Sequence, residues 1–417
     1  MQIELVKGVD LKVLSTQKFK TVSIRINFKS LIDANEITKR ALLANLLSTN
    51  SQHYPTQTDY RTALSELYGA QFSSDVSKIG KYHVLTLDLD IVDETYLNEK
   101  GLFEKATEFL KNILFYPNVH DGAFHKETFK RELENLKDEY EAVYEDKQEY
   151  AGIETSRLYF DTLEQQIPSW GRPEDLTGLL PSDLYTVYQD MILNDKIDIV
   201  VLGNLEEERV KKAFIDFNFE ARMVNNELLF YSISEVKNLT RKKEIQPITQ
   251  AKLNLAYKTT IYYHQDLYYA GQVFNGLFGG FPHSNLFTIL REQEGLAYDI
   301  ASGIDSFNGV LYVQSGIEPS EAIKVEKLVG EQLNSIQEGA FSEEVIDQTK
   351  ALLKNALIQS EDHAESLMEK YYSFNLIDKP MISLGEWADR IDAVSKQDII
   401  NVAKTVELKA VFLLSGE

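Results

Sequence analysis

The feature that most constrains the fold of this 417-residue chain is an internal duplication, in which the second half repeats the first at an offset of about 215 residues. The alternating segment Asn27–Ser30 aligns with Ala256–Thr259. Glu145–Asp146, late in a long amphipathic segment, aligns with Glu361–Asp362. Each half also ends with an apolar strand that runs into a glycine. The repeats of solenoid proteins are about 20–50 residues long. The much longer period here therefore indicates a duplicated domain.

The order of elements predicts the architecture of each half. In the first half, Val22, Ile24, Ile26 and Phe28 alternate on one face of a strand, which is followed by an apolar helix. The elements predicted there are strands at 22–28, 71–76 and 82–91 and helices at 37–47, 58–68, 102–114 and 125–146. This mixture predicts an α+β fold with two homologous domains, each an antiparallel β-sheet of about five or six strands packed with α-helices.

We expect the boundary between the domains in a polar and charged segment. The N-terminal domain is predicted at 1–220, a linker at 221–246 and the C-terminal domain at 247–417. The linker contains the polar run Val224–Glu227 and the charged run Arg241–Glu244. Such compositions are typical of connections between domains.

Charge and composition exclude several classes of partner. The formal net charge is −22, which argues against binding to nucleic acid or to an anionic membrane surface. The chain has no cysteine, so it can form neither a disulfide nor a thiolate metal site. No apolar run approaches the roughly 18 residues of a membrane span, and the first residues show no signal-peptide pattern. We therefore expect a cytoplasmic protein.

The segment Leu290–Tyr298 reads L-R-E-Q-E-G-L-A-Y and follows a glycine pair, Gly279 and Gly280. Arg291 offers five donors in a rigid fork that suits carbonyl or carboxylate oxygens, and the hydroxyl of Tyr298 can donate to a developing oxyanion. On spacing alone, an arginine among glutamates is also a common salt-bridged surface residue, and the tyrosine could line the rim of a core.

This string, followed by the strand-like run Ile300–Ile317, resembles the C-terminal half of the M16 peptidases (the insulinase, pitrilysin and mitochondrial processing peptidase family). The resemblance implies the LuxS/M16 metallopeptidase-like fold, with the two domains forming half of a clamshell. It also implies that Arg291 and Tyr298 contact the substrate backbone and the oxyanion, and that Gly279, Gly280 and Gly295 belong to the substrate-binding segment.

The zinc motif of that family, H-x-x-E-H on the first helix, is absent. The corresponding helix has Arg40 and Ala44 in place of the two histidines and Leu43 in place of the general base. None of these three can ligate zinc or act as a base. No two of the seven histidines stand four residues apart, and Glu139 would be a leftover third ligand or simply a solvated residue of an acidic helix. We therefore expect no metal and no cofactor in this chain.

A chain with the substrate-holding pair but without the metal site resembles the non-catalytic member of a heterodimeric M16 endopeptidase. The resemblance implies a sister subunit that carries H-x-x-E-H and zinc, an unfolded peptide as substrate, and Arg291 and Tyr298 acting in trans. Two alternatives remain. The chain could be a non-enzymatic scaffold or peptide-binding protein, or an autonomous metallopeptidase with a metal site that the histidine pattern does not reveal.

Overall fold

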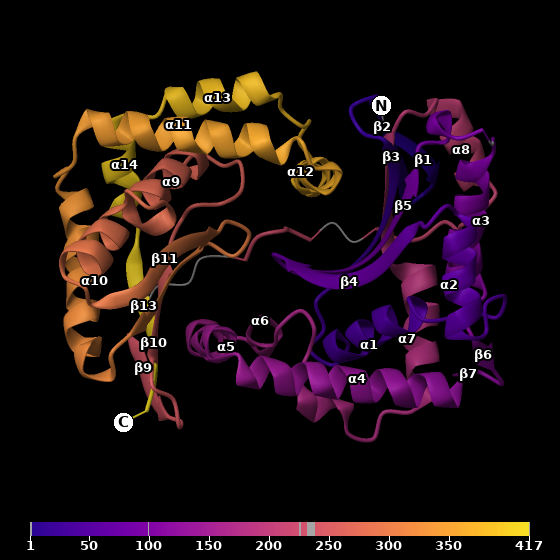
Figure 1. The fold of residues 1–417 in the computed structure, drawn as a ribbon, viewed down its shortest axis with the longest axis horizontal. Helices are drawn as coiled ribbons and strands as arrows, with labels where there is room; N and C mark the ends of the chain where they lie inside the picture. Colours follow the sequence, from indigo (N-terminus) through magenta and orange to yellow (C-terminus); the bar gives the residue numbers. More distant parts are fainter. Residues whose placement is uncertain (1, 99, 225–226, 232–237, 417) are drawn as a thin grey trace. The chain divides into compact units, whose positions relative to one another are not determined.

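The computed structural model describes residues 2–98, 100–224, 227–231 and 238–416. The chain forms two compact units that are not contiguous in sequence. Unit 1 comprises Met1–Tyr140, Pro168–Leu229 and His363–Met381, and unit 2 comprises Glu141–Ile167, Phe230–Asp362 and Ile382–Glu417. Each unit contains one large β-sheet with helices packed on it (Figure 1).

The sheet of unit 1 has six strands in the order β1-β2-β8-β3-β5-β4. β2 and β8 run parallel and the other neighbours run antiparallel. The strands are β1 Gln2–Val6, β2 Val9–Ser15, β3 Thr21–Leu31, β4 Gln71–Ile79, β5 Tyr82–Val92 and β8 Lys196–Gly203, with a separate pair β6 Val119–His120 and β7 Ala123–Phe124.

The sheet of unit 2 has five strands in the order β11-β12-β10-β13-β9, and its single parallel pair is β9 with β13. The strands are β9 Thr240–Ile245, β10 Ala251–Lys258, β11 Ala297–Asp305, β12 Val310–Ile317 and β13 Glu407–Ser415. The order of strands therefore repeats between the units, with β3 equivalent to β10 and β8 equivalent to β13. Asn27 pairs with Asp198, and Ala256, which aligns with Asn27 in the sequence, pairs with Ala410 of the equivalent strand.

Helices cover these sheets, and the four helices predicted in the first half correspond to α1, α2, α3 and α4. Those of unit 1 are α1 Ile37–Leu47, α2 Gln57–Glu66, α3 Leu102–Phe115, α4 Lys126–Glu145, α7 Pro181–Asn194, α8 Glu207–Ile215 and α12 Ala364–Leu376, with the last turn of α4 in unit 2. Those of unit 2 are α5 Lys147–Tyr159, α6 Leu163–Gln166, α9 Tyr268–Asn275, α10 Ala322–Gln337, α11 Glu343–Ser360, α13 Leu384–Asp392 and α14 Lys396–Ala403. Short helical turns are η1 Glu94–Tyr96, η2 Pro173–Leu176, η3 Gly276–Gly280, η4 Leu286–Gln293 and η5 Pro319–Glu321. The predicted strand run at 300–317 is the hairpin of β11 and β12.

Two helices belong to the unit opposite to their half of the sequence. α5, from the first half, packs on β10 and β13, where Ala151 contacts Phe412 and Leu414. α12, from the second half, packs on β8 and β3, where Met368 contacts Val200 and Leu202. The two helices are equivalent in the duplication, so the halves have exchanged them. The predicted domains at 1–220 and 247–417 did not include this exchange, because the periodicity of a helix does not show which sheet it packs on.

The segment predicted as a linker at 221–246 is partly a strand. Thr240–Ile245 forms β9 at the edge of the unit 2 sheet, although five of its six residues are polar or charged. Residues 225–226 and 232–237 of the same segment lie outside the described residues. Among the helices that the structure describes, none combines the length and the apolar character needed to cross a membrane.

Candidate functional site

The helix that the sequence resemblance equates with the zinc-binding helix of the M16 peptidases, α1, is buried on most sides. Its Arg40 points into the interior, where Nη2 lies 2.7 Å from Oδ2 of Asp195 and donates to the backbone oxygen of Phe28 at 3.0 Å. Nε of Arg40 donates to Nδ1 of His83 at 3.1 Å. The guanidinium is therefore held by a carboxylate, a carbonyl and an imidazole inside unit 1.

Burial shifts the pKa values of both ionisable partners of Arg40, His83 and Asp195. Nε2 of His83 lies 2.8 Å from the carbonyl oxygen of Ser169, which can only accept, so Nε2 carries the proton and Nδ1 is the acceptor. Burial and the charge of Arg40 lower the pKa of His83 to about 3, so this histidine is neutral at physiological pH. Burial raises the pKa of the Asp195 carboxyl, and the charge of Arg40 opposes that shift.

The donor set around α1 does not fit a zinc ion. Leu43 and Ala44, which align with the base and the second histidine, are fully buried and have no lone pair to offer. Within the described ranges, no three His, Cys, Asp or Glu side chains are grouped so that they could hold a metal ion. Glu139 lies exposed on α4, where desolvation and the charge of Glu132 raise its pKa, and its role as a leftover ligand stays a prediction.

The Arg291–Tyr298 segment connects the helical turn η4 to strand β11. Leu290 and Leu296 are buried, and the N–H of Leu296 donates to the carbonyl of Leu290 at 2.8 Å, which closes the turn. Gly295 occupies this turn with a φ of +63°, a conformation that favours glycine. The apolar residues of the string thus form the inner side of the turn, while Arg291 and Tyr298 remain on the outer side.

Tyr298 stands on a β-bulge at the free edge of the unit 2 sheet. Ala297 pairs with Ile317 and Asp299 pairs with Gly316, so Tyr298 has no partner in the register of β11 and β12. A bulge changes the direction of a side chain, and bulges are frequent beside active sites. The side chain of Tyr298 is 57% exposed, which leaves it accessible to another molecule.

The hydroxyl of Tyr298 donates to the carboxylate of Glu318, which follows the end of β12. This hydrogen bond and the charge of Glu318 raise the pKa of Tyr298, so the phenol is a neutral donor. The sequence analysis missed Glu318, which lies 20 residues beyond Tyr298. The signal that could have revealed it is the register of the hairpin, because only the pairing of Ala297 with Ile317 brings the two residues together.

Arg291 has a different local partner. It lies in the last turn of η4 with its guanidinium carbon 4.6 Å from the centroid of the Phe287 ring, four residues earlier. In the described part of the chain no hydrogen bond or ring contact joins Arg291 to Tyr298. The structure therefore places both residues on one exposed turn, each with its own neighbour, and their contact with substrate stays a prediction.

Gly279 and Gly280 have a packing reason to be glycines. A Cβ atom on Gly279 would lie 2.6 Å from Oγ of Ser302 and 2.8 Å from Cδ1 of Leu286, and one on Gly280 would lie 2.8 Å from Nδ2 of Asn275. Real Cβ atoms essentially never make contacts this short, so Gly279 lets η3 approach β11 closely and Gly280 lets η3 pack against the end of α9. Their contact with substrate stays a prediction.

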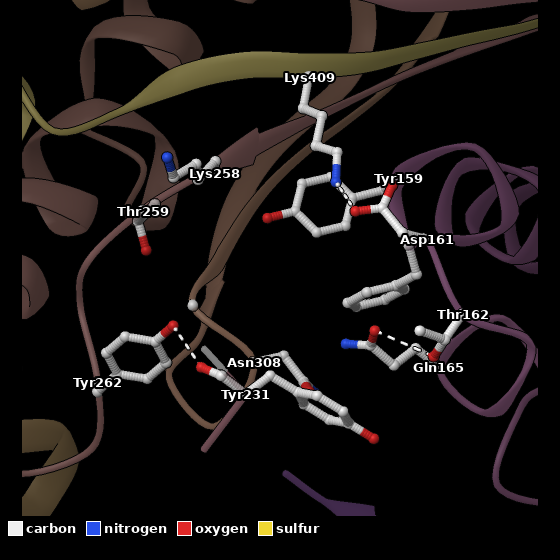
Figure 2. Close-up of a pocket in the computed structure, with 12 residues that line it drawn as sticks. Tyr159, Asp161, Thr162, Gln165, Tyr231, Lys258, Thr259, Tyr262, Asn308 and Lys409 are labelled. Carbon is white, nitrogen blue, oxygen red and sulfur yellow. Dashed lines mark hydrogen bonds and ion pairs between the residues drawn. The ribbon is translucent and has the colours of Figure 1, made fainter. Parts of the chain in front are cut away.

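Two cavities lie outside the residues that the sequence analysis selected. In unit 1 a cavity of about 450 Å³ lies between α12 and the sheet, and its Arg25 contacts Asp88 through Nε at 2.7 Å and Glu369 through Nη1 at 3.1 Å. In unit 2 a cavity of about 230 Å³ lies at the ends of α5, β10 and β13 and contains Lys258 and Lys409 (Figure 2). No motif marks these residues in the sequence, since they come from strands and helices far apart in the chain.

Comparison with known proteins places these observations in a family. The family model described as Peptidase M16 inactive domain matches residues 180–353. A Bacillus subtilis (strain 168) protein described as probable inactive metalloprotease YmfF is 33% identical over 420 residues, which cover 98% of this chain and 96% of that protein.

Two solved structures extend the comparison to the fold. A conserved protein from Enterococcus faecalis V583 matches with a TM-score of 0.96 and 42% identity over 100% of this chain and 98% of that one. The peptidase M16 inactive domain from Pseudomonas fluorescens matches with a TM-score of 0.82 over 100% and 98% of the two chains. At 13% identity the second match concerns the fold alone.

Proposed function

The chain belongs to the M16 peptidase family, and from that premise we propose that it is the non-catalytic, substrate-binding subunit of a heterodimeric zinc-dependent endopeptidase. Its sister subunit would carry the H-x-x-E-H motif and the zinc ion, and the substrate would be an unfolded peptide. We place this complex in the cytoplasm. This chain would supply Arg291 and Tyr298 to the sister's active site.

One observation carries the proposal. Of the two functional parts of an M16 peptidase, this chain lacks the zinc motif but keeps the Arg and Tyr of the substrate-holding pair. At the position of the zinc motif, Arg40 is tied into the interior by Asp195 and His83, and the neighbouring positions are apolar. At the position of the substrate-holding pair, Tyr298 stands exposed on a bulge at a sheet edge. A chain that had lost all enzymatic roles would have no need to keep this second arrangement.

The roles of the two residues follow from their chemistry. The guanidinium of Arg291 makes no ion pair among the described residues, so its donors are available to peptide carbonyls. The phenol of Tyr298 is kept protonated and can donate to a carbonyl oxygen that gains negative charge. For this it must release Glu318, and a substrate carbonyl would therefore compete with that carboxylate for the proton of the hydroxyl.

The proposal is tested by measuring bound zinc and cleavage of an unstructured peptide, for this chain alone and after co-expression with an H-x-x-E-H homologue from the same genome. We expect zinc and cleavage only in the complex. In that complex, Arg291→Ala and Tyr298→Phe should each lower kcat about 10- to 100-fold. A matched control is Lys327→Gln on α10, an exposed lysine whose ion pair among the described residues is with Glu331 at 3.3 Å.

The alternative is a scaffold or peptide-binding protein, and the local contacts of the pair favour it to some degree. A tyrosine bonded to an exposed glutamate and an arginine over a phenylalanine are arrangements found on ordinary surfaces. Under this alternative the complex would form, but Arg291→Ala and Tyr298→Phe would leave its turnover unchanged. Zinc and cleavage with the isolated chain would instead support an autonomous metallopeptidase.

A further inference from the structure

The cavity in unit 2 has an excess of positive charge, although the chain as a whole carries a net charge of −22. Lys258 and Lys409 line it together with a single carboxylate, Asp161. Nζ of Lys409 lies 3.1 Å from Asp161 and 4.9 Å from the centroid of the Tyr159 ring (Figure 2). Lys258 has no ion pair among the residues that the structure describes. One cation is therefore left for an anion from outside.

Neutral hydrogen-bond donors surround the two lysines. Burial raises the pKa of the Tyr159 hydroxyl, which stays protonated, and the hydroxyl oxygen of Thr259 already accepts from the N–H of Ile261 at 3.3 Å. The side-chain carbonyl oxygen of Gln165 accepts a hydrogen bond from the hydroxyl of Thr162 at 3.2 Å. The amide N–H groups of Gln165 therefore remain able to donate. Within the described part of the chain, none of these donors is used by a protein acceptor, so the cavity offers hydrogen bonds to an acceptor-rich group.

Aromatic rings form the remaining wall and limit the size of the ligand. Tyr159 and Phe160 pack edge to face with centroids 4.9 Å apart, and Tyr262 lies across the cavity from them (Figure 2). Gly309, with a φ of +67°, lets the Tyr262 hydroxyl approach, because a Cβ atom there would lie 2.9 Å from it. The volume of about 230 Å³ is below the range of about 300–1,000 Å³ for cofactor or drug sites, so one residue fits better than a cofactor.

We infer that this cavity binds the C-terminal residue of a short peptide, with its free carboxylate at Lys258, the lysine without an ion pair among the described residues, and its side chain against the aromatic wall. A carboxylate carries one charge, which suits the single uncompensated lysine. A phosphate dianion carries two charges, of which this lysine would balance only one, and the carboxylate of Asp161 would repel the dianion more strongly than a single carboxylate. The inference rests on the proposed function only for the nature of the ligand, since the cavity lies within unit 2 and uses neither zinc nor Arg291 and Tyr298.

Binding to the isolated chain tests this inference without any peptidase activity, so it can fail independently of the proposed function. N-acetyl-phenylalanine and N-acetyl-phenylalaninamide are titrated at low ionic strength and pH 7, and binding is followed by NMR. The free acid should bind at least about tenfold more tightly than the amide, because only the acid forms a charge-assisted hydrogen bond with Lys258. Lys258→Gln should weaken binding of the acid about tenfold, and Lys409→Met, which removes a cation already paired with Asp161, should weaken it less.

Lys327→Gln serves as the charge-matched control and should leave binding unchanged. Lys409 is only 14% exposed, so its variant is checked for folding by circular dichroism, and Lys258→Gln provides the second, independent variant. Equal binding of acid and amide, or no binding of the acid, would overturn the inference. Tighter binding of inorganic phosphate than of the acid would also overturn it, in favour of a site for inorganic anions.

Discussion

Arg40 and Asp195 form an ion pair inside unit 1, with side chains that are only 5% and 2% exposed and a distance of 2.7 Å between Nη2 and Oδ2. The pair stands at the position where the family resemblance would put the first histidine of the zinc motif. Removing one member of a buried pair leaves an uncompensated charge, which costs far more than the pair contributes to stability. The loss of the metal motif has thus created a structural dependence at the same place.

We expect Arg40→Met to lower the free energy of unfolding by about 3–5 kcal/mol, because Asp195 would be left buried without its partner. The double variant Arg40→Met/Asp195→Asn should recover part of that loss, since no buried charge then remains. Urea denaturation of the wild type, both single variants and the double variant measures the coupling. A loss below about 1 kcal/mol for Arg40→Met would contradict the assigned burial of the pair.

Replacing Glu318 should change the acidity of Tyr298. In Glu318→Gln the carboxylate that disfavours the phenolate is gone, so the pKa of Tyr298 should fall toward its ordinary value. NMR titration of ring-labelled tyrosine measures this pKa, and Tyr298→Phe assigns the resonance. An unchanged pKa would show that the two side chains do not meet in solution. In the complex with a zinc-bearing sister, the same variant should raise kcat/KM, because the substrate no longer competes with Glu318.

Because of Lys29, we expect the free energy of unfolding to depend on pH in the alkaline range. Burial lowers its pKa to about 8, although Asp198 and Asp10 oppose the shift, and its Nζ lies 4.6 Å from the centroid of the Tyr82 ring. Between about pH 8 and 10.5 the folded state binds fewer protons than the unfolded state, so the free energy of unfolding should rise with pH.

Lys29→Met isolates this contribution. The wild type should gain about 1–2 kcal/mol more than the variant between pH 7.5 and 9.5, and the variant should be the more stable protein at pH 7.5. Urea denaturation at the two pH values, for both proteins, provides the measurement. Parallel behaviour of the two proteins would mean that Lys29 is better solvated than its position indicates.

Replacing the glycines near the Arg291–Tyr298 segment by alanine should lower the stability by different amounts. Gly279→Ala should destabilise the protein by about 1–3 kcal/mol, because its Cβ would overlap Ser302 and Leu286. Gly295→Ala meets nothing within 4 Å and should cost only about 1 kcal/mol, through its positive φ. Thermal unfolding distinguishes the two. If Gly279→Ala lowered turnover of the complex but not its melting temperature, a direct role in substrate binding would replace the packing role.

The sequence predicted most of the secondary structure because strand alternation and helix periodicity are local signals. The predicted helix at 37–47 coincides with α1, and the strand at 82–91 ends one residue before β5 does. β9 was missed because Thr240–Ile245 is an exposed edge strand whose charged composition is that of a linker. Its strand character comes from parallel pairing with β13, some 170 residues later in the chain, which no local pattern reveals.

The candidate site was predicted only in its contiguous part. Arg291 and Tyr298 lie in one short string, whereas Glu318 reaches Tyr298 through the hairpin register and Lys409 reaches Tyr159 through the packing of α5 on β13. Arg40 was identified as a substitution for a metal ligand, but its burial with Asp195 depends on the pairing of β3 with β8 and on the packing of α7. Such partners come from the fold and have no separate signal in the sequence.

The exchange of α5 and α12 also sets the order in which the protein can mature during synthesis. When the first 220 residues have left the ribosome, Val200 and Leu202 still lack the helix that covers them, because α12 begins only at Ala364. Conversely, α5 is made early and must wait for Phe412 and Leu414, which are among the last residues to emerge. Neither unit can finish folding before translation is nearly complete, so apolar sheet and helix faces stay uncovered until the last part of the chain has been made.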